Sequence, residues 1–512
     1  MHKWAVQSGI QTFGPELMQA GALTHNQREA NMQTGNFIGR TEESRLLEAY
    51  CSSNNSELVA VYGRMRVGKT FLIRHVFEGR FDFEYTAKYR SPAKVQIREF
   101  QRELNRLSGN SAGSAGDWFE AFQNLQDYLI SLGKERVIVF IDELPWMDTV
   151  KSDFLAAFSS FWNCWRSSGT LLKVYVCGSA TTWMVDKFIG DRGGLYGRIS
   201  RSIYLSPFSL LETERYLNDI RGMHYSRKQV LDTYMIFGGI PYYLAMLDRD
   251  KPLSRNVDDL LFAENGPLRP EFDFIFRSLF KDSSNYRRVV ETLAVKITGL
   301  TREEISKGCR ISGGDLTRIL KNLISCDFIR SYTAPRKKER AKMYQLTDMF
   351  SLFYLRFVGN GAAGQDENFW TNLGKTGVKN SWAGYAFEQA CLHHIRQIKL
   401  KLGISGILSN VYAWSMKAYT DADGSHWDGG QIDLIIDRND DVMNLCEMKY
   451  SSDSYEIDAG YESAIRKRIE MFRHAERSRK DLRCTFITLY GVRKNKHSGI
   501  VDSELVLDDL FA

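Results

Sequence analysis

Residues 58–70 read LVAVYGRMRVGKT, and this stretch decides the fold of the first half of the chain. The apolar run LVAVY predicts a buried strand, and FLIRHVF, which follows the stretch, predicts an amphipathic helix. Between them, GRMRVGKT fits the pattern G-x-x-x-x-G-K-[S/T] in full. By average residue usage this pattern should arise by chance roughly 0.02 times in such a chain. The sequence therefore predicts a phosphate-binding loop rather than an ordinary glycine turn before a helix.

The residue types of this loop suit a nucleotide. Glycines allow backbone N–H groups to turn toward phosphate oxygens, and the helix N-terminus adds partial positive charge. Lys69 can reach the β- and γ-phosphates, and the Thr70 hydroxyl can bind magnesium. We expect ATP to contact the whole loop, which consists of Gly63, Arg64, Met65, Arg66, Val67, Gly68, Lys69 and Thr70.

A second apolar run ends in two acids. VIVFIDELPWM, residues 137–147, predicts a buried strand that places Asp142 beside the loop. An aspartate there can act as an outer ligand of magnesium, and Glu143 can polarise the attacking water as a general base. The string is weak evidence alone, but behind a complete loop it predicts the second half of an ATP-hydrolysing site.

Two more polar residues are candidates for the same site. Ser179 follows the strand VYVCG, at the carboxyl edge where ligands bind in open α/β sheets. It could sense the γ-phosphate or its water, and the alternative is a simple helix cap. Arg198, in the glycine-rich GGLYGRIS, could be an arginine finger or phosphate sensor, and the alternative is a surface arginine.

Composition sets the broad class of the protein. The chain has 512 residues, with 43% hydrophobic and 25% charged, as in an ordinary globular protein of several domains. No apolar run approaches the roughly 20 residues that span a bilayer, and the N-terminus lacks a signal-peptide pattern. The eight cysteines are scattered without a C-x-x-C pair, which suits reduced thiols in a cytoplasm. The net charge of +6 permits a nucleic-acid partner without demanding one.

The middle of the chain predicts a winged helix. Residues 300–332 read as two short helices joined by a turn and followed by a strand, and a hairpin then carries the tip RKKERAK. A recognition helix in a DNA groove and a basic wing on phosphates is one interpretation. The other is a protein–protein spacer with a solvated tip. The wing cations with which we associate DNA binding are Arg336, Lys337, Lys338 and Arg340.

The tail contains QIDLIIDRNDDVMNLCEMKY, residues 431–450. Its two apolar runs predict paired buried strands, yet they carry Asp433, Glu447 and Lys449. Buried charges are costly unless they are paired or bind a metal. Glu447 and Lys449 are two residues apart, so both project from one face of the strand. These residues predict either a structural ion cluster or a metal site.

The order of these parts resembles the archaeal-type P-loop ATPases of the AAA+/STAND class. The matching pieces are FIGRTEESRLLEAY, VYGRMRVGKT, FIDELPW, CGSATTWM, PFS, FGGIPYYL and YQLTDMFSLFYLRFV. The resemblance implies an α/β P-loop core, a helical lid, a winged helix and a C-terminal α/β restriction-endonuclease-like domain, which is degenerate in many relatives. The expected parts are an N-terminal extension (1–36), the ATPase core (37–210), the lid (211–285), the winged helix (286–358), a linker (359–380) and the nuclease-like domain (381–512).

The tail is similar to the PD-(D/E)xK pattern of such nucleases. The similarity implies that Glu388 on the first helix, Asp433 and Glu447 hold magnesium. Lys449 would then position or deprotonate the attacking water. An E-x-K tripeptide is expected about twice by chance in such a chain, and Gly-Gly-Gln-Ile stands where the family has a proline before Asp433. The alternative is an inactive cluster inherited from a nuclease.

Our leading prediction is a magnesium-dependent ATPase whose nucleotide state controls a C-terminal half that binds DNA or also cleaves it. ATP, DNA and a second copy of the chain or another protein are the expected partners, in the cytoplasm and without a membrane. The first alternative is an ATP-dependent switch or scaffold whose nuclease-like domain only binds a partner. A nucleotide kinase shares the loop, but Glu143 directly after Asp142 and the additional domains disfavour it.

Overall fold

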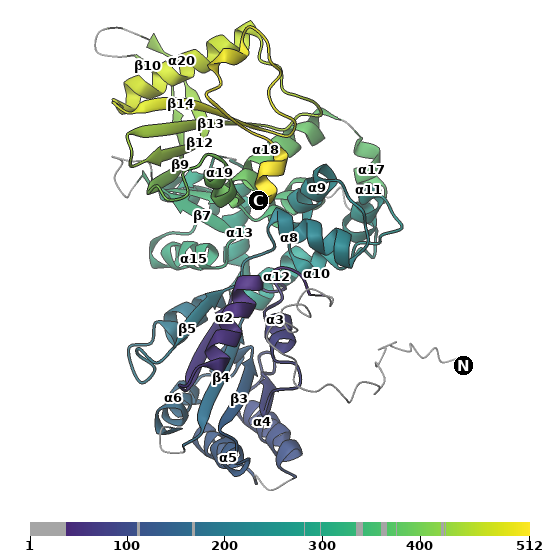
Figure 1. The fold of residues 1–512 in the computed structure, drawn as a ribbon, viewed down its shortest axis with the longest axis vertical. Coiled ribbons are helices and arrows are strands. Elements are labelled where there is room, and N and C mark those ends of the chain that lie inside the picture. Colours follow the sequence, from purple (N-terminus) through teal and green to yellow (C-terminus); the bar gives the residue numbers. More distant parts are fainter. Residues whose placement is uncertain are drawn as a thin grey trace.

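The computed structural model of the chain describes residues 37–109, 113–165, 169–280, 282–296, 298–333, 341–359, 366–374, 376–420, 424 and 426–512. Figure 1 shows the first sheet domain at the bottom of the view, helical parts in the middle and a second sheet domain at the top. No helix within these ranges is both long and apolar enough to cross a membrane.

The first domain is built on a parallel five-stranded sheet with the order β2-β3-β4-β1-β5. Strand β4 lies between β1, which leads into the loop, and β3, which ends in Asp142. Parallel strands are buried on both faces, and this explains their nearly continuous apolar sequences. The strands are β1 (Glu57–Tyr62), β2 (Phe83–Thr86), β3 (Arg136–Asp142), β4 (Leu171–Gly178) and β5 (Arg201–Tyr204).

Alternate residues of β1 enter different cores. Val59 and Val61 pack with Leu47 of α2 and Leu72 of α3, whereas Leu58 joins the apolar side chains of the helices on the other face. Both faces of the sheet are therefore covered, and the α/β core expected from the sequence is confirmed. The helices of this domain are α2 (Thr41–Ser52), α3 (Lys69–Val76), α4 (Ala93–Ser108), α5 (Trp118–Ser131), α6 (Phe154–Cys164), α7 (Thr181–Trp183), η1 (Leu144–Trp146) and η3 (Met184–Ile189).

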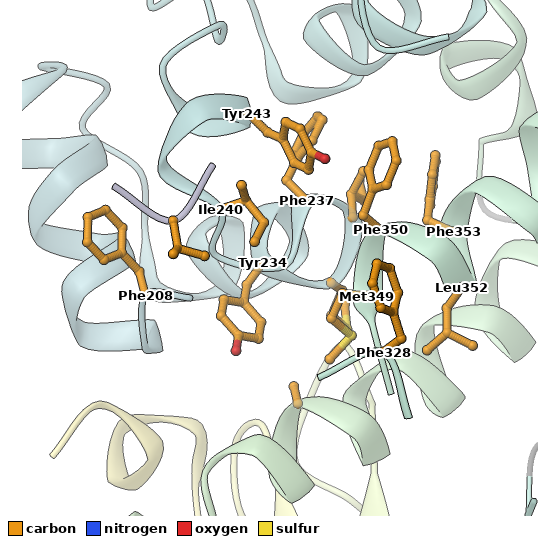
Figure 2. Packing of buried hydrophobic residues seen from close by; sticks show 14 of the residues in the cluster. Phe208, Tyr234, Phe237, Ile240, Tyr243, Phe328, Met349, Phe350, Leu352 and Phe353 are labelled. Carbon is orange, nitrogen blue, oxygen red and sulfur yellow. The ribbon is translucent and has the colours of Figure 1, made fainter. Parts of the chain in front are cut away.

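Helices follow the first domain, as the sequence predicts. They include α8 (Leu210–Arg215) and α9 (Arg227–Phe237), each of which begins with a capping box. In Figure 2, Tyr243 from this part lies beside Phe350, which stands more than 100 positions later in the sequence, and their ring centroids are 4.8 Å apart. The remaining elements are η4 (Tyr216–Ile220), α10 (Pro241–Leu244), α11 (Leu253–Val257), η5 (Asp258–Phe262) and α12 (Glu271–Leu279).

The third part combines helices with a small antiparallel sheet of order β6-β8-β7. Helix α15 follows α14 after a short turn, and β7 and β8 then form the sides of a hairpin. The hairpin tip, residues 334–340, lies outside the described residues. The elements are α13 (Ser283–Ala294), β6 (Leu300–Thr301), α14 (Arg302–Cys309), α15 (Gly313–Ser325), β7 (Ile329–Tyr332), β8 (Met343–Leu346), α16 (Met349–Phe353) and η7 (Tyr354–Val358).

The C-terminal part is a second α/β unit. Its sheet has the order β15-β14-β13-β12-β9, in which β9, β12 and β13 are antiparallel while β13, β14 and β15 are parallel. Helix α20 makes the crossover between the parallel strands β13 and β14. The elements are α18 (Gly377–His393), α19 (Ile395–Lys401), β9 (Ser409–Met416), β10 (Tyr419–Thr420), β11 (His426–Trp427), β12 (Gly430–Arg438), β13 (Val442–Lys449), α20 (Ala459–Glu476), β14 (Asp481–Thr488), η8 (Ser498–Ile500), β15 (Ser503–Leu505) and η9 (Leu507–Phe511).

Part of the segment expected as a linker, 359–380, is helical. Helix α17 (Phe369–Leu373) lies within it, and α18 begins at Gly377 rather than after residue 380. Trp370 of α17 packs edge-on against Phe353, Phe357 and Trp382. This aromatic cluster buries apolar area that holds α17 in place, although the surrounding sequence is polar and glycine-rich.

His394, between α18 and α19, joins the C-terminal part to the helices above the first domain. It is buried, and its Nε2 accepts a hydrogen bond from the N–H of Leu210 at 2.9 Å. Since Nε2 accepts, Nδ1 carries the proton and lies 2.7 Å from the carbonyl oxygen of Ala390. The imidazole is therefore neutral, and burial lowers its pKa from 6.5 to about 4.

We expect acid to weaken this junction. The unfolded chain takes up a proton at His394 near pH 6.5 but the folded chain only near pH 4, so stability falls as the pH falls through this window. The contribution of this histidine should reach about 3 kcal/mol at pH 4. Thermal unfolding between pH 7 and 4 should show this loss for the wild type and a smaller one for His394→Gln. An identical pH slope in both proteins would assign the acid sensitivity to other groups.

Candidate functional site

The loop between β1 and α3 needs glycine at both ends. Gly63 has φ 151°, and a Cβ there would lie 2.3 Å from the carbonyl oxygen of Leu205. Gly68 has φ 93°, a left-handed conformation that a side chain would strain. Because α3 starts at Lys69, the free N–H groups of its first turn face the loop. The chain thus builds an anion-binding helix N-terminus at the edge of the sheet.

A cavity of about 740 Å³ opens beside this loop. Lys69, Thr70, Glu143 and Ser179 form its polar wall. The loop residues on its surface are Met65, Arg66, Val67, Gly68, Lys69 and Thr70. Its volume lies within the usual range for small-molecule sites. The structure therefore brings most of the expected nucleotide-binding residues to one cavity.

Lys69 is buried at the base of the loop. Its ammonium group donates to the carbonyl oxygens of Gly63 at 3.1 Å and Arg64 at 3.0 Å, and to Ser179 Oγ at 2.9 Å. All three donor positions of the lysine are thus occupied by the protein itself. A phosphate group can replace the backbone carbonyls as the partner of this charge.

Asp142 lies opposite Thr70, as the sequence predicts. The Thr70 hydroxyl lies 3.0 Å from both carboxylate oxygens, and the N–H of Glu143 donates to Oδ1 at 2.9 Å. The thiol of Cys177 also donates to Oδ1, at 2.5 Å. Burial first, and then the charge of Asp142, raise the pKa of this thiol well above its ordinary value, so it stays a donor. Cys177 is a neighbour of Asp142 that the sequence did not indicate.

Glu143 and Ser179 contact each other directly. Ser179 donates to the Glu143 carboxylate through its hydroxyl at 2.5 Å and through its N–H at 3.1 Å. Glu143 has φ 51°, so the chain turns sharply between β3 and η1 and aims this side chain along the sheet edge. Lys69, Ser179 and Glu143 form one hydrogen-bonded chain across the cavity wall.

The side chains of the two loop arginines leave the loop in different directions. Arg66 pairs with Glu271 at 2.9 Å and lies over the ring of Tyr242 at 4.0 Å, at the cavity. Arg64 does not line the cavity and pairs with Asp348. Arg198, the expected finger, is exposed and also lies off the cavity wall, so within the described chain it does not join the site.

The apolar side of the cavity comes from residues that the sequence analysis did not single out as site residues. Phe37, Ile38, Phe208, Tyr216 and Ile220 line it, and Phe37 stacks on His75 with ring centroids 4.2 Å apart. Such a surface suits a purine base beside the phosphate-binding loop. Phe37 and Ile38 belong to FIGR, just before α2, and Phe208 belongs to PFS, just after β5. No spacing rule in the sequence links these strings to the nucleotide cavity.

The comparison with known families also assigns a nucleotide-binding domain to this part of the chain. Residues 37–247 match the family described as an ATPase domain predominantly from Archaea. The match covers the loop, Asp142, Glu143 and Ser179, and it ends before α11. These residues therefore form an ATP-binding P-loop ATPase domain.

Two curated relatives come from Methanocaldococcus jannaschii. An uncharacterized protein is 25% identical over 417 residues, which cover 81% of this chain and 87% of the relative. This similarity is longer than the family match, so it extends into the later parts of the chain. An uncharacterized ATP-binding protein is 43% identical over 44 residues, 9% of this chain and 75% of the relative.

Among solved structures, a Walker-type ATPase of Pyrococcus abyssi matches with 21% identity and a TM-score of 0.44, covering 62% of this chain and 96% of that one. The ORC2 protein of Aeropyrum pernix, in complexes with ADPNP and ADP, matches with 14% identity and a TM-score of 0.39, covering 63% and 93%. At these TM-scores the likenesses add nothing to the family match.

The C-terminal part contains a second group of charged residues. Glu388 lies on α18, Asp433 on β12, and Glu447 and Lys449 on β13, as the sequence predicts. The register of β12 against β9 shifts between Ile432 and Ile435, which is where Asp433 stands. The Glu447 carboxylate pairs with Arg468 and with Lys449 at 3.4 Å, and it accepts the hydroxyl of Tyr461 at 2.9 Å.

The three acids are near enough that the charge of a neighbour adds to burial in raising the pKa values of Glu388 and Asp433. Burial, and then the neighbouring Asp433, raise the pKa of Glu388 to about 8. Burial, and then the charge of Glu447, raise the pKa of Asp433. At Lys449, burial alone would lower the pKa, but the negative charge of Glu447 outweighs it and raises the pKa above its ordinary value. Within the described ranges, however, no three His, Cys, Asp or Glu side chains are close enough to hold a metal ion. Arg468 and Lys449 neutralise Glu447 instead.

The expected recognition helix, α15, contacts the first domain. Lys321 pairs with Asp186 of η3 at 2.8 Å, and α15 packs against α7. Thr181, at the start of α7, follows Ser179 by two residues, so α15 lies close to the nucleotide site. The four wing cations that we expected to contact DNA lie outside the described residues.

Proposed function

We propose that the chain hydrolyses ATP with magnesium. The observation that carries the proposal is the hydrogen-bonded chain of Lys69, Ser179 and Glu143 beside Thr70 and Asp142 at one cavity. Each of these groups has a separate role in phosphoryl transfer to water. The family match of residues 37–247 supports the same activity.

Magnesium fits the oxygen atoms beside the loop. The Thr70 hydroxyl and the Asp142 carboxylate are hard oxygen donors 3.0 Å apart, which is the chemistry that this ion prefers. They would hold the ion, and it would supply positive charge next to the β- and γ-phosphates. Cys177 and the N–H of Glu143 keep the carboxylate oriented through Oδ1.

The residues of the chain then act on the phosphates and the water. Lys69 leaves the carbonyl oxygens of Gly63 and Arg64 and donates to phosphate oxygens, where negative charge develops. Glu143 accepts a proton from the attacking water, whose oxygen forms the new bond to phosphorus as ADP departs. Ser179 holds Glu143 before the reaction and can sense the γ-phosphate when Lys69 moves.

A hydrolysis assay tests the proposal. The purified full chain should convert ATP to ADP and inorganic phosphate in equal amounts, with magnesium and without any other phosphate acceptor. EDTA should stop the reaction. Consumption of ATP only when a second nucleotide is present would favour the kinase alternative instead.

We further propose that the C-terminal part binds DNA and is the place of a second, magnesium-dependent activity. The proposal rests on Glu388, Asp433 and Glu447, whose closeness adds to burial in raising the pKa values of the first two, and on Lys449, which lies 3.4 Å from Glu447. Glu447 would have to release Arg468 before it and Asp433 could hold a metal ion, which would supply positive charge at the scissile phosphate. The rival is a switch whose paired cluster is purely structural, and the ion pairs of Glu447 support that rival. We also propose that Arg198 acts as an arginine finger in the nucleotide site of a second copy of the chain.

The acidic cluster gives a prediction that separates these two functions. Asp433→Ala should abolish nicking of plasmid DNA and weaken manganese binding by the full chain, while ATP hydrolysis continues. Because Glu388 has a pKa near 8, metal binding must displace its proton, so affinity should rise between pH 6.5 and 8. Lys449→Ala should keep the metal but lose cleavage.

Asp440→Ala is the matched control, because Asp440 lies in the hairpin between β12 and β13 and pairs with Arg438 at the surface. It should leave nicking and metal binding as in the wild type. Metal affinity that is unaffected by Asp433→Ala and by pH would instead assign the cluster to the structural alternative.

A further inference from the structure

Arg64, the second residue of the phosphate-binding loop, has a side chain that reaches another part of the chain. Its guanidinium forms an ion pair with Asp348, which lies 284 residues later in the sequence. Both side chains are only 3% exposed. The ring of Phe328 covers the guanidinium at 4.9 Å. A buried and covered ion pair therefore connects the loop to a region outside the ATPase family match.

Asp348 is itself held rigidly. It is the N-cap of α16, and its Oδ2 accepts the N–H of Ser351 at 2.9 Å and the Ser351 hydroxyl at 2.5 Å. The other carboxylate oxygen, Oδ1, is left for Arg64. Oδ2 of Asp348 thus caps α16, and Oδ1 holds the arginine of the loop. In Figure 2, Phe350, two residues after Asp348, lies beside Tyr243 of the helical part.

A second contact lies beside the ion pair. The turn after α15 brings Asp327 to the hydroxyl of Tyr204, at the end of β5. Tyr204 in turn contacts the ring of Tyr62, the last residue of β1 before the loop. Asp348 is therefore placed over the start of the loop by the fold and not by one flexible side chain.

The charge of Arg64 depends on this arrangement. Burial alone would lower its pKa, but Asp348, with the oxygens of Tyr243 and Tyr204, raises it above the ordinary value. Among the described residues, none accepts a hydrogen bond from the buried Nη2, so the guanidinium has little other compensation. A buried charge left without its partner is strongly destabilising, so the loop and Asp348 must move together.

The loop backbone at Arg64 is also part of the nucleotide site, because its carbonyl oxygen accepts a hydrogen bond from Lys69 at 3.0 Å. Lys69 must release at least one of its three protein acceptors, of which this oxygen is one, before it can donate to phosphate. Arg64 thus has its backbone in contact with the group that binds the γ-phosphate and its side chain in contact with α16.

We propose that Asp348 is a positioning residue of the nucleotide site, which acts through Arg64 to hold the phosphate-binding loop in its binding conformation. The inference rests on the proposed ATP hydrolysis and names how that site is regulated. By thermodynamic reciprocity, nucleotide in the loop must also stabilise the docking of α16, and with it the helices that α16 contacts. Release of α16 then weakens ATP binding.

The test uses the full chain and its steady-state hydrolysis of ATP. Asn is a good helix N-cap, so Asp348→Asn should keep α16 while removing the charge that orients Arg64. The expected result is a KM about tenfold higher with kcat within about twofold of the wild type. Asp348→Glu, which can restore the ion pair, should bring KM back toward the wild-type value. Adding Arg64→Gln to Asp348→Asn should cause no further loss, because both changes break the same contact.

Asp186→Asn is the matched control, because Asp186 pairs with Lys321 between the same two parts of the chain but at the surface. It should leave KM unchanged. If Asp348→Asn unfolds, Arg64→Gln replaces it, because this variant removes the other charge of the same ion pair, and the same KM change is expected. A wild-type KM in Asp348→Asn, or losses that add up in the double variant, would overturn the inference and leave the proposed function intact. A wild type that neither binds nor hydrolyses ATP would overturn both.

Discussion

Lys69→Ala should reduce ATP turnover at least about 100-fold, because it removes the side-chain charge that meets the β- and γ-phosphates. The ammonium group now has three protein acceptors at 2.9 to 3.1 Å, two of which are loop carbonyls that phosphate can replace. A charge-assisted hydrogen bond contributes about 1.5–3 kcal/mol, so nucleotide affinity should also fall roughly tenfold or more. Phosphate release and binding of a fluorescent ATP analogue measure the two effects separately.

Lys187→Ala provides the control for this variant. Lys187 belongs to the same domain, is 61% exposed and pairs with Asp148, so its loss removes a positive charge without touching the cavity. Its turnover should match the wild type. Ordinary turnover in Lys69→Ala would exclude Gly63–Thr70 as the catalytic phosphate-binding loop.

The nucleotide site could be predicted from sequence because its parts obey fixed local rules. A strand, a glycine loop and a helix are consecutive, and Asp142 and Ser179 each follow the end of a buried strand. In a parallel sheet the carboxyl ends of the strands meet at one edge, so local reading was enough to bring these residues together. The resemblance to PD-(D/E)xK nucleases, and not a local rule, placed Glu388 and Asp433 on the first helix and second strand of the tail. The period of two alone predicts that Glu447 and Lys449 share one face of β13.

The contacts that connect the parts could not be predicted in this way. The pairing of Arg64 with Asp348 spans 284 residues, and nothing in either local sequence identifies the partner. The apolar wall formed by Phe37, Phe208 and Tyr216 has the same origin, because its members come from three segments that meet only in the folded chain. The role of Arg468 was also missed, because cations on an amphipathic helix usually face solvent, and this one faces Glu447.

Glu143→Gln should leave ATP binding nearly unchanged and slow hydrolysis by roughly 100- to 10,000-fold, the range that general bases contribute. The amide has the size of the carboxylate. Its oxygen can still accept the N–H of Ser179 and its NH2 group can donate to Ser179 Oγ, so the left-handed turn at residue 143 should persist. It cannot take the proton from water, so the variant should accumulate in the ATP-loaded state. A single-turnover experiment would show retained labelled ATP after rapid gel filtration, with phosphate appearing only slowly.

Ser179→Ala distinguishes the base from the residue that holds it. It removes the acceptor of Lys69 and the hydroxyl donor to Glu143 but leaves the carboxylate itself, so we expect a loss smaller than that of Glu143→Gln. The hydrolysis rates of Ser179→Ala and Glu143→Gln should therefore be compared, and ATP binding should be measured for both. If Glu143 had only a structural role, Glu143→Gln would lose nucleotide binding together with hydrolysis. Binding that collapses in Glu143→Gln would therefore move the proton-accepting role away from this residue, since a side chain needed only to maintain the turn cannot separate the two steps.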